Sequence, residues 1–255
     1  MRADRRIAVA GATGRVGRHA VEVLGERGFD AVAMSRSSGV DVITRKGLDE
    51  ALEGVEAVID AATGPSAEQR AATEFFTTAA RNLQEAAARA GARRMVVVSI
   101  IGIDGFTGGY SAAKLVHERE HLAGPVPARI LRAAQFHEFV EQLVEWGRQG
   151  DVSYVQKMRT QPVAARSVAE ALVDLATEPG EDAAAEPVEI AGPREESMVD
   201  MAALLVARRG DPVRIEAVSD PADPDSRLYE SGALLPGPGA ILAGPTFQEW
   251  LEATA

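Results

Sequence analysis

Two side chains near the middle of the chain have the types and spacing of a proton-transfer pair. Tyr110 and Lys114 are four residues apart in the segment YSAAK, so on a helix they share one face. An adjacent ammonium group stabilises a phenolate and lowers the tyrosine pKa from its reference value of about 10. Tyr110 is therefore predicted to donate a proton to a carbonyl oxygen. A surface pair without chemistry is the alternative.

Ser99 ends the apolar run 95–99 that precedes this pair. Its hydroxyl can orient a substrate carbonyl, or it can cap the turn that follows. The predicted catalytic set is Tyr110, Lys114 and Ser99. His117 and His121 follow in the same segment and are expected to face solvent.

A second motif, GATGRVG at residues 11–17, lies between an apolar run at 7–10 and a segment with helical spacing. Strand, glycine turn and helix in this order are typical of dinucleotide binding. Gly11 allows the tight turn, Gly14 admits a pyrophosphate, and Gly17 lets the helix pack closely on the sheet, with the anion at the helix N-terminus. A plain connection between strand and helix is the alternative.

The segment MSRSSG, at the end of the second expected strand, indicates which dinucleotide is bound. An acidic residue there binds the ribose 2′-hydroxyl of NAD, whereas an arginine suits a 2′-phosphate. Arg36 lies among Ser35, Ser37 and Ser38, with no carboxylate to repel phosphate. Arg15 can reach the same charge. The sequence therefore predicts NADP(H) in preference to NAD(H), with an ordinary solvated arginine as the alternative.

These motifs need elements that bring strand ends together. Strands are expected at 7–10, 31–34, 57–61, 95–99 and 128–131, with a weak one at 40–43, and helices near 48–53, 66–90, 110–122 and 135–147. The alternation predicts an α/β fold with a doubly wound parallel sheet, the Rossmann fold. Ligands of such sheets bind at the carboxyl ends of the strands, where every motif above falls.

The pattern becomes mixed after residue 150. Helices are expected at 168–176, 197–208 and 247–251, strands at 188–190 and 213–218, and a loop rich in proline and glycine at 220–239. We expect a dinucleotide-binding domain over 1–150. A smaller substrate-binding lobe over 151–255 would be interleaved with it as one structural unit.

Composition excludes several classes of function. The formal net charge of −11 argues against a nucleic-acid or anionic-membrane binder. The chain has no cysteine, and its four histidines show no convincing ligand spacing, so no metal site is predicted. Without a signal-peptide pattern or a membrane span, a cytoplasmic protein is expected. Association into an oligomer is left open.

The motifs GATGRVG, NLQEAAARAGARRMVVVSIIGID, YSAAK, ILRAAQFHEFV, QPVAARSVAEAL and FQEWL together resemble the NmrA-like branch of the atypical short-chain dehydrogenase/reductases. The gap from Ser99 to Tyr110 is shorter than in the core reductases. The resemblance implies a pyrophosphate site at Gly11, Thr13, Gly14, Arg15, Val16 and Gly17, with Arg36 at the 2′-phosphate and Ala61, Ala62 and Thr63 at the adenosine. It also implies that Lys114 binds the nicotinamide ribose and that Ala133, Ala134 and Gln135 line the nicotinamide end.

Some of the side chains expected to contact the substrate come directly after the last strand of the sheet. Phe136 and His137 are expected near the crevice, with Tyr154 and Met158 on the opposite wall. An apolar, partly aromatic lining suits a small carbonyl, enone or quinone better than a sugar nucleotide. Plain core packing of these side chains is the alternative.

The predicted function is an NADPH-dependent oxidoreductase that acts on such a small-molecule substrate. Two alternatives from other classes stay open, because the family it resembles includes them. One is a redox sensor that binds NADP(H) without turnover, and the other is an isomerase or epimerase that recycles its NADP(H).

Overall fold

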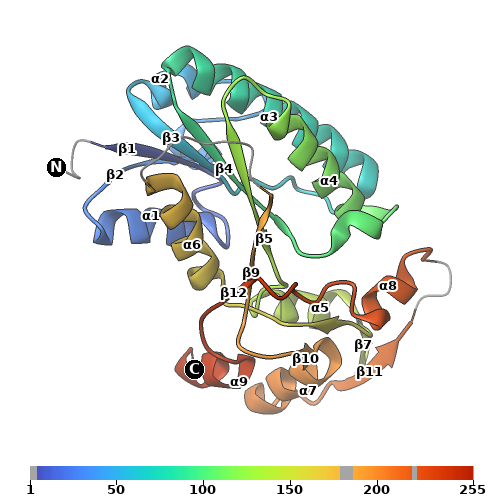
Figure 1. Cartoon of the computed structure of the whole chain (residues 1–255). Helices are drawn as coiled ribbons and strands as arrows, with labels where there is room; N and C mark the ends of the chain where they lie inside the picture. The colour runs from blue at the N-terminus through green and yellow to red at the C-terminus, as the bar shows by residue number, and fades with distance from the viewer. Residues whose placement is uncertain (1–4, 179–185, 220–222, 255) are drawn as a thin grey trace. The chain divides into compact units, whose positions relative to one another are not determined.

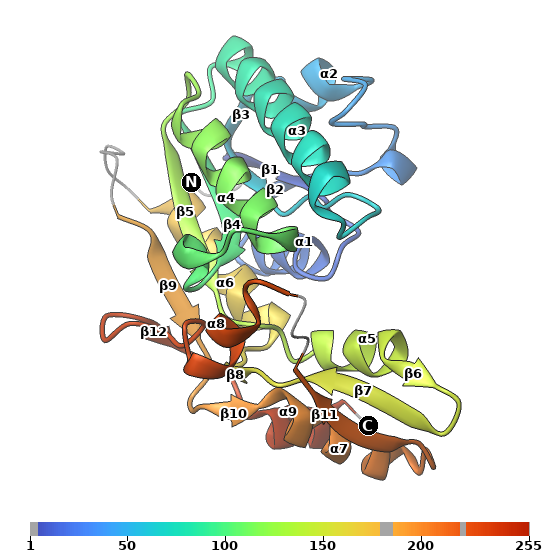
Figure 2. The same ribbon diagram turned by 90° about the vertical axis from the view of Figure 1, so that its right-hand side faces the viewer.

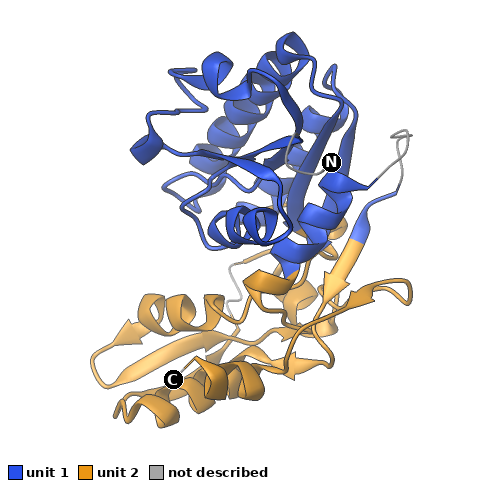
Figure 3. Ribbon diagram, turned by 90° about the vertical axis from the view of Figure 1, so that its left-hand side faces the viewer, with its two compact units in different colours: residues 1–99, 109–132, 168–188 blue, residues 100–108, 133–167, 189–255 orange. Residues whose placement is uncertain are grey.

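The computed structural model describes residues 5–178, 186–219 and 223–254. The chain divides into two compact units, coloured in Figure 3. Unit 1 comprises residues 1–99, 109–132 and 168–188, and unit 2 comprises 100–108, 133–167 and 189–255. The domain division at residue 150 stays a prediction. Within the described ranges, no helix has the length and apolar character needed to cross a membrane.

Unit 1 is built on a parallel sheet with the strand order β5-β4-β3-β1-β2. The strands are β1 (Arg6–Ala10), β2 (Asp30–Met34), β3 (Val55–Asp60), β4 (Arg94–Ile100) and β5 (Ala128–Ala133). Ile7 of β1 is in register with Ala31 of β2 on one side and with Ala57 of β3 on the other. The strand order reverses beside β1, which makes the carboxyl ends of β1 and β3 the place where such a sheet binds ligands.

Helices cover both faces of this sheet (Figure 1). They are α1 (Gly17–Glu26), α2 (Leu48–Leu52), α3 (Gln69–Ala90), α4 (Gly109–Leu122) and α6 (Ala165–Thr177). One face carries α1 and α6, joined by an ion pair between Arg27 and Asp174, and the other carries α2, α3 and α4. α3 and α4 run side by side in Figures 1 and 2. The predicted α/β doubly wound fold is confirmed.

Alternate residues of the central strands face the two helical layers, because side chains alternate along a strand. Ala8 and Val58 pack in one core with Leu83 and Ala87 of α3. Asp60 is two residues beyond Val58 and therefore lies on the same face of the sheet, toward α3 and α4.

Unit 2 holds a three-stranded sheet of order β11-β7-β6 and the strand pairs β10-β8 and β9-β12. Its helices are α5 (Phe139–Trp146), α7 (Met198–Arg209), α8 (Ser226–Ser231) and α9 (Phe247–Ala253). The strands are β6 (Arg148–Gln149), β7 (Val152–Gln156), β8 (Arg159–Thr160), β9 (Val188–Ala191), β10 (Glu196–Ser197), β11 (Arg214–Val218) and β12 (Ile241–Leu242). α5 and α7 pack against each other and against β7.

Residues 40–43, expected as a weak strand, form a turn instead. The Asp41 carboxylate accepts hydrogen bonds from Ile43 N at 2.8 Å and Thr44 N at 3.3 Å. An aspartate that bonds the backbone two residues ahead stabilises a turn in preference to a strand.

Three other predictions need correction in unit 2. The helix expected from residue 135 begins at Phe139, because Phe136 forms a bridge with Val163. β7 was not predicted, and the buried Ser153 interrupts its apolar pattern. α8 lies within the expected loop 220–239, of which residues 220–222 fall outside the described part of the chain.

Candidate active site

The turn after β1 is tight and closely packed. Gly11 has a φ of +74°, and Gly14 N donates to Gly11 O at 2.8 Å. A Cβ on Gly17 would lie 2.2 Å from Gly11 O, and a Cβ on Gly11 would lie 2.6 Å from Ala61 O. Only glycine fits at positions 11 and 17. The backbone N–H groups at the start of α1 follow this turn, and a helix N-terminus in such a position can bind a phosphate group.

Residues 61–63 follow β3 and lie against this turn. Ala61 N donates to Ala10 O at 3.1 Å, and Ala62 N donates to Asp60 Oδ1 at 2.9 Å. The segment predicted to hold the adenosine therefore adjoins the predicted pyrophosphate loop. Both lie where the strand order reverses.

The end of β2 continues into a short 3-10 helix, η1 (Arg36–Ser38). Ser35 Oγ accepts from Ser38 N at 3.2 Å, and Ser38 Oγ donates to Ala33 O at 2.9 Å. These hydroxyl groups stabilise the turn at η1. Arg36 in η1 is exposed, so its guanidinium group can bind a phosphate. The hydrogen bond from Ile43 N holds the pKa of the Asp41 carboxyl below its usual value, and the Arg36 charge adds to this.

Tyr110 lies in the first turn of α4 and is half-buried. Its Oη is hydrogen-bonded to Thr63 Oγ1 at 3.0 Å, and its ring packs edge-on against Phe76 with 5.5 Å between centroids. Burial raises the pKa of Tyr110, while the Thr63 hydrogen bond and the Arg15 charge oppose the rise. The sequence predicted a lowered pKa for Tyr110, and this prediction is wrong. Tyr110 is a protonated phenol at neutral pH.

Lys114 has a buried side chain, which is only 4% exposed. Its Nζ donates to Val98 O and to His117 Nδ1, each at 2.8 Å, and lies 4.6 Å from the centroid of the Phe76 ring. Burial lowers the pKa of Lys114 to about 8, and the carboxylates of Asp60 and Glu118 oppose this shift. Tyr110 and Lys114 share a helix face, yet within the described residues no hydrogen bond joins them.

Two histidines expected in solvent are instead buried against Asp60. His117 Nε2 and His121 Nε2 each lie 2.9 Å from Asp60 Oδ2, and none of the three side chains is more than 1% exposed. Although burial opposes it, the hydrogen bonds from both rings hold the pKa of Asp60 well below its usual value. Burial and the Lys114 charge lower the pKa of His117 to about 3, so this ring is neutral.

A signal for this cluster is present in the sequence. Residues 110, 114, 117 and 121 recur at intervals of four, three and four, the spacing of one helix face. The face was expected to turn outward after Lys114 because its residues are polar. The structure buries Lys114, His117 and His121, whereas Leu122 of the same helix is 49% exposed.

Ser99 is buried at the end of β4, and its Oγ has no hydrogen-bond partner among the described residues. Buried hydroxyl groups are normally paired, so Ser99 Oγ has a hydrogen-bonding capacity that the described residues leave unused.

The residues predicted to bind the nicotinamide end and the substrate belong to unit 2. They are Ala133, Ala134, Gln135, Phe136, His137, Tyr154 and Met158. Gln135 Oε1 accepts a hydrogen bond from Thr160 Oγ1, Met158 is buried, and Tyr154 is exposed.

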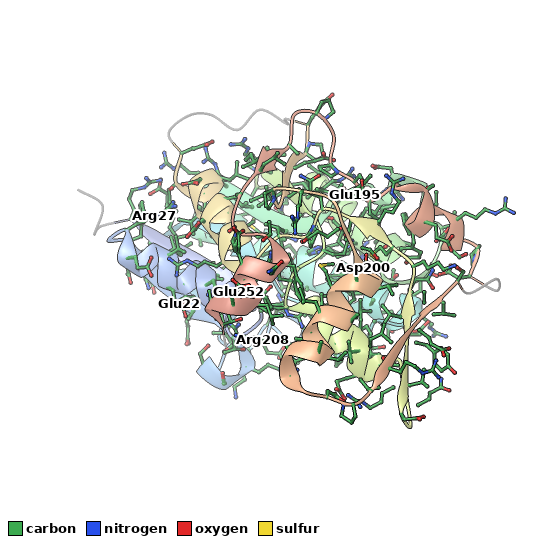
Figure 4. The ribbon with its side chains drawn as sticks, turned by 90° about the horizontal axis from the view of Figure 1, so that it is seen from below. Glu22, Arg27, Glu195, Asp200, Arg208 and Glu252 are labelled. Atoms are coloured by element: carbon green, nitrogen blue, oxygen red, sulfur yellow. The ribbon has the colours of Figure 1, made fainter. Side chains whose placement is uncertain are left out.

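His137 lines a hollow of about 350 Å³ in unit 2, formed with side chains of α7 and α9. Its ring packs on Phe247 and Trp250, its Nε2 donates to Pro245 O at 3.0 Å, and its Nδ1 has no partner in the described part of the chain. Arg208 on α7 lines the same hollow and is labelled in Figure 4. Burial lowers the pKa of His137, so the ring is neutral near pH 7.

Comparison with known families now places the chain. The model of the NAD(P)H-binding family matches residues 11–179, about two thirds of the sequence. The chain belongs to this NAD(P)H-binding family. No relative was found among curated proteins.

Solved structures of low sequence identity share the fold. One is MoeE5 in complex with UDP-glucose and NAD, 20% identical with a TM-score of 0.72, over 97% of this chain and 96% of that chain. The UDP-N-acetylglucosamine 4-epimerase from Bacillus cereus is 15% identical with a TM-score of 0.70, over 98% and 94%. A short-chain dehydrogenase/reductase superfamily protein from Agrobacterium tumefaciens with bound NAD is 18% identical with a TM-score of 0.68, over 98% and 95%.

The predicted NAD(P)-binding Rossmann fold is confirmed by the family match and by the fold that the solved structures share. Membership of the atypical short-chain dehydrogenase/reductases stays a prediction, as does the NmrA-like branch.

Proposed function

We propose that the protein is an NADPH-dependent oxidoreductase of the NmrA-like branch. It would reduce a small, largely apolar carbonyl, enone or quinone, with Tyr110 as the proton donor. The observation that carries this proposal is the hydrogen bond between Tyr110 and Thr63. It ties the candidate acid to the segment that packs on the glycine turn, so acid and dinucleotide loop are held together within unit 1.

The glycine turn fits a dinucleotide because Gly11 and Gly17 let the backbone fold tightly between β1 and α1, where a Cβ at either position would clash with backbone atoms. Residues 13–16 would hold the pyrophosphate with these glycines, and residues 61–63 the adenosine. Arg36 supports NADPH over NADH, since a guanidinium group pairs well with a 2′-phosphate. When bound, the nicotinamide supplies the hydride.

Tyr110 would give its phenolic proton to the substrate oxygen as negative charge develops there. Its raised pKa keeps that proton in place beforehand. An ammonium group has three N–H donors, and Val98 O and His117 accept two from Lys114. The third would bind a ribose hydroxyl, and the charge would stabilise the phenolate left after transfer. Ser99 Oγ would orient the substrate carbonyl.

The substrate class rests on the side chains predicted to line the pocket, Phe136, His137, Tyr154 and Met158. Three of the four carry aromatic rings, and the fourth is a flexible apolar side chain, which suits a flat, largely apolar acceptor.

An epimerase with recycled cofactor is the second candidate, because structural neighbours such as the 4-epimerase from Bacillus cereus are sugar-nucleotide enzymes. Oxidation of a sugar hydroxyl needs a base in its first step. A tyrosine with a raised pKa is an acid at neutral pH, which supports reduction over this candidate.

The test is NADPH consumption, followed by absorbance, with a panel of quinones, enones and small ketones for wild type and Tyr110→Phe. We expect turnover of one substrate class and a loss of about 100- to 10,000-fold in kcat in the variant, with NADPH binding unchanged. If both proteins bind NADPH and neither consumes it, the redox-sensor alternative replaces the reductase. Tightly retained NADP(H) with conversion of a UDP-sugar and no net oxidation would identify the epimerase.

A further inference from the structure

The buried face of α4 carries four polar groups in contact, which we call the α4 cluster: Lys114, His117, Asp60 and His121. They form a chain of short contacts, from Lys114 Nζ to His117 Nδ1 at 2.8 Å and from both His Nε2 atoms to Asp60 Oδ2 at 2.9 Å. In the proposed reduction Asp60 and His121 have no part, and His117 enters only as an acceptor for Lys114.

Protons in the α4 cluster can be assigned from donor chemistry. An ammonium group only donates, so His117 Nδ1 must accept from Lys114. The proton of the neutral His117 ring is then on Nε2, from which it donates to Asp60. A carboxylate only accepts, so His121 also donates to Asp60 through its Nε2, which lies 3.2 Å from His117 Nε2. His121 Nδ1 has no partner among the described residues.

These contacts define the place of the Lys114 ammonium group. Val98 O on β4 and His117 on α4 accept from it, and the Phe76 ring of α3 lies beneath it. The charged groups around it are Asp60 on β3 and Glu118 on α4. Glu118 is itself bound to Arg132 of β5 through two hydrogen bonds of 3.0 and 2.8 Å. Within the described ranges, His117 is thus the side chain that accepts a hydrogen bond from Lys114.

We propose that His117, oriented by Asp60, is a positioning residue that fixes the direction of the Lys114 ammonium group and holds its proton. The consequence for catalysis rests on the proposed function. The contact itself does not, and a titration of Lys114 tests it without turnover. Burial lowers the pKa of Lys114 to about 8, so a lost acceptor would discharge it within the physiological range.

The same three ligand atoms, Asp60 Oδ2 and the two His Nε2 atoms, are close enough to share a metal ion. A metal needs the lone pair of Nε2, which the proton assignment above places out of reach on His117. A cation would also be repelled by the nearby ammonium group. The arrangement therefore favours protons on the two His Nε2 atoms over a bound metal ion.

Lys114 can be titrated directly because the chain has two other lysines, Lys46 and Lys157, both exposed. In a background of Lys46→Arg and Lys157→Arg, protein labelled with ¹⁵N-lysine has one ζ-nitrogen NMR resonance, that of Lys114. Its chemical shift is followed from pH 6 to pH 11.

Two substitutions of His117 separate its two hydrogen bonds. Asparagine places an acceptor oxygen near the position of Nδ1, and glutamine places a donor nitrogen near that of Nε2. We expect His117→Gln to lower the Lys114 midpoint by about one pH unit, since a hydrogen bond to the charged form is lost. His117→Asn should shift it by less than half as much. His121→Gln is the matched control, because it alters the cluster without touching Lys114.

The kinetic readout is the pH profile. With the Lys114 midpoint one unit lower, His117→Gln should lose about fivefold in kcat at pH 8 and little at pH 6. A merely structural defect would lower the rate equally at both pH values.

Equal Lys114 midpoints in wild type, His117→Gln and His117→Asn would overturn the proposal. So would one equivalent of tightly bound metal whose removal shifts the Lys114 resonance. If the midpoints move as expected but no substrate consumes NADPH, the role of His117 toward Lys114 stands and the reductase function fails.

Discussion

The hydroxyl group of Ser99 is buried at the end of β4 without a partner among the described residues. A buried hydroxyl left unpaired costs about 1 to 3 kcal/mol, so Ser99→Ala should leave the free energy of unfolding unchanged or raise it by about 1 kcal/mol. The same change should lower kcat at least tenfold if Ser99 orients the substrate. Urea unfolding and NADPH consumption measure the two effects. A loss of stability above 1 kcal/mol would show that the hydroxyl is paired in the folded protein.

Arg36 determines the cofactor preference in the proposed function. Charge-assisted hydrogen bonds contribute about 1.5 to 3 kcal/mol, so Arg36→Ala should weaken NADPH binding roughly 10- to 100-fold and change NADH binding little. Titration calorimetry with both cofactors measures this. Arg89→Ala is a suitable control, because Arg89 is an exposed arginine at the end of α3 paired with Asp49. Equal weakening of both cofactors by Arg36→Ala would contradict a role at the 2′-phosphate.

At the scale of single residues, the sequence predicted that Tyr110 and Lys114 share a helix face, but it did not predict their contacts or protonation states. The Tyr110 to Lys114 spacing indicated a shared face, and α4 provides it. The pKa of Tyr110 depends on burial and on Thr63, which lies 47 residues away in sequence, so no local pattern could give its direction. The buried Asp60 was missed for the same reason, since its partners come from another element.

Helix α1 contains two glycines, Gly17 in the glycine turn and Gly25 near its end, so Gly25 can serve as a control for Gly17. A Cβ on Gly17 would meet Gly11 O at 2.2 Å, whereas one on Gly25 would meet nothing within 4 Å. Gly17→Ala should therefore distort the loop and abolish measurable NADPH binding. Gly25→Ala should raise the free energy of unfolding by up to about 0.5 to 1 kcal/mol, because alanine is the better helix former in the last turn of α1, and should leave binding intact. Calorimetry and thermal unfolding measure both. Normal cofactor affinity in Gly17→Ala would place the dinucleotide elsewhere.

Elements with strong hydrophobic periodicity were predicted well, and those held by side-chain hydrogen bonds were not. The five strands of unit 1 and the helices α1 to α4 follow the expected alternation. The turn at Asp41 and the start of α5 depend on single contacts that compete with periodicity. α4 is a further case, because it buries Lys114 and His117 where the rule expects apolar residues.

In the whole molecule, the strand order places chemistry from distant segments at one site. The reversal beside β1 brings the glycine turn against residues 61–63, and Thr63 in turn holds Tyr110. The same side of β3 buries Asp60 with its two histidines. Because folding lowers the pKa values of both Asp60 and His117, the cluster couples folding to pH.

The His117 ring makes unfolding sensitive to acid. Its pKa is about 3 when folded and 6.5 as its usual value, so between these pH values the unfolded chain binds a proton that the folded chain does not. Its stabilising contribution is full above pH 6.5 and is lost as pH falls toward 3, with a slope of up to about 1.4 kcal/mol per pH unit. His117→Gln has no such group, so its free energy of unfolding should fall less steeply between pH 6.5 and pH 4. Urea unfolding at four pH values tests this, and parallel curves for the two proteins would mean that His117 is protonated in the folded state.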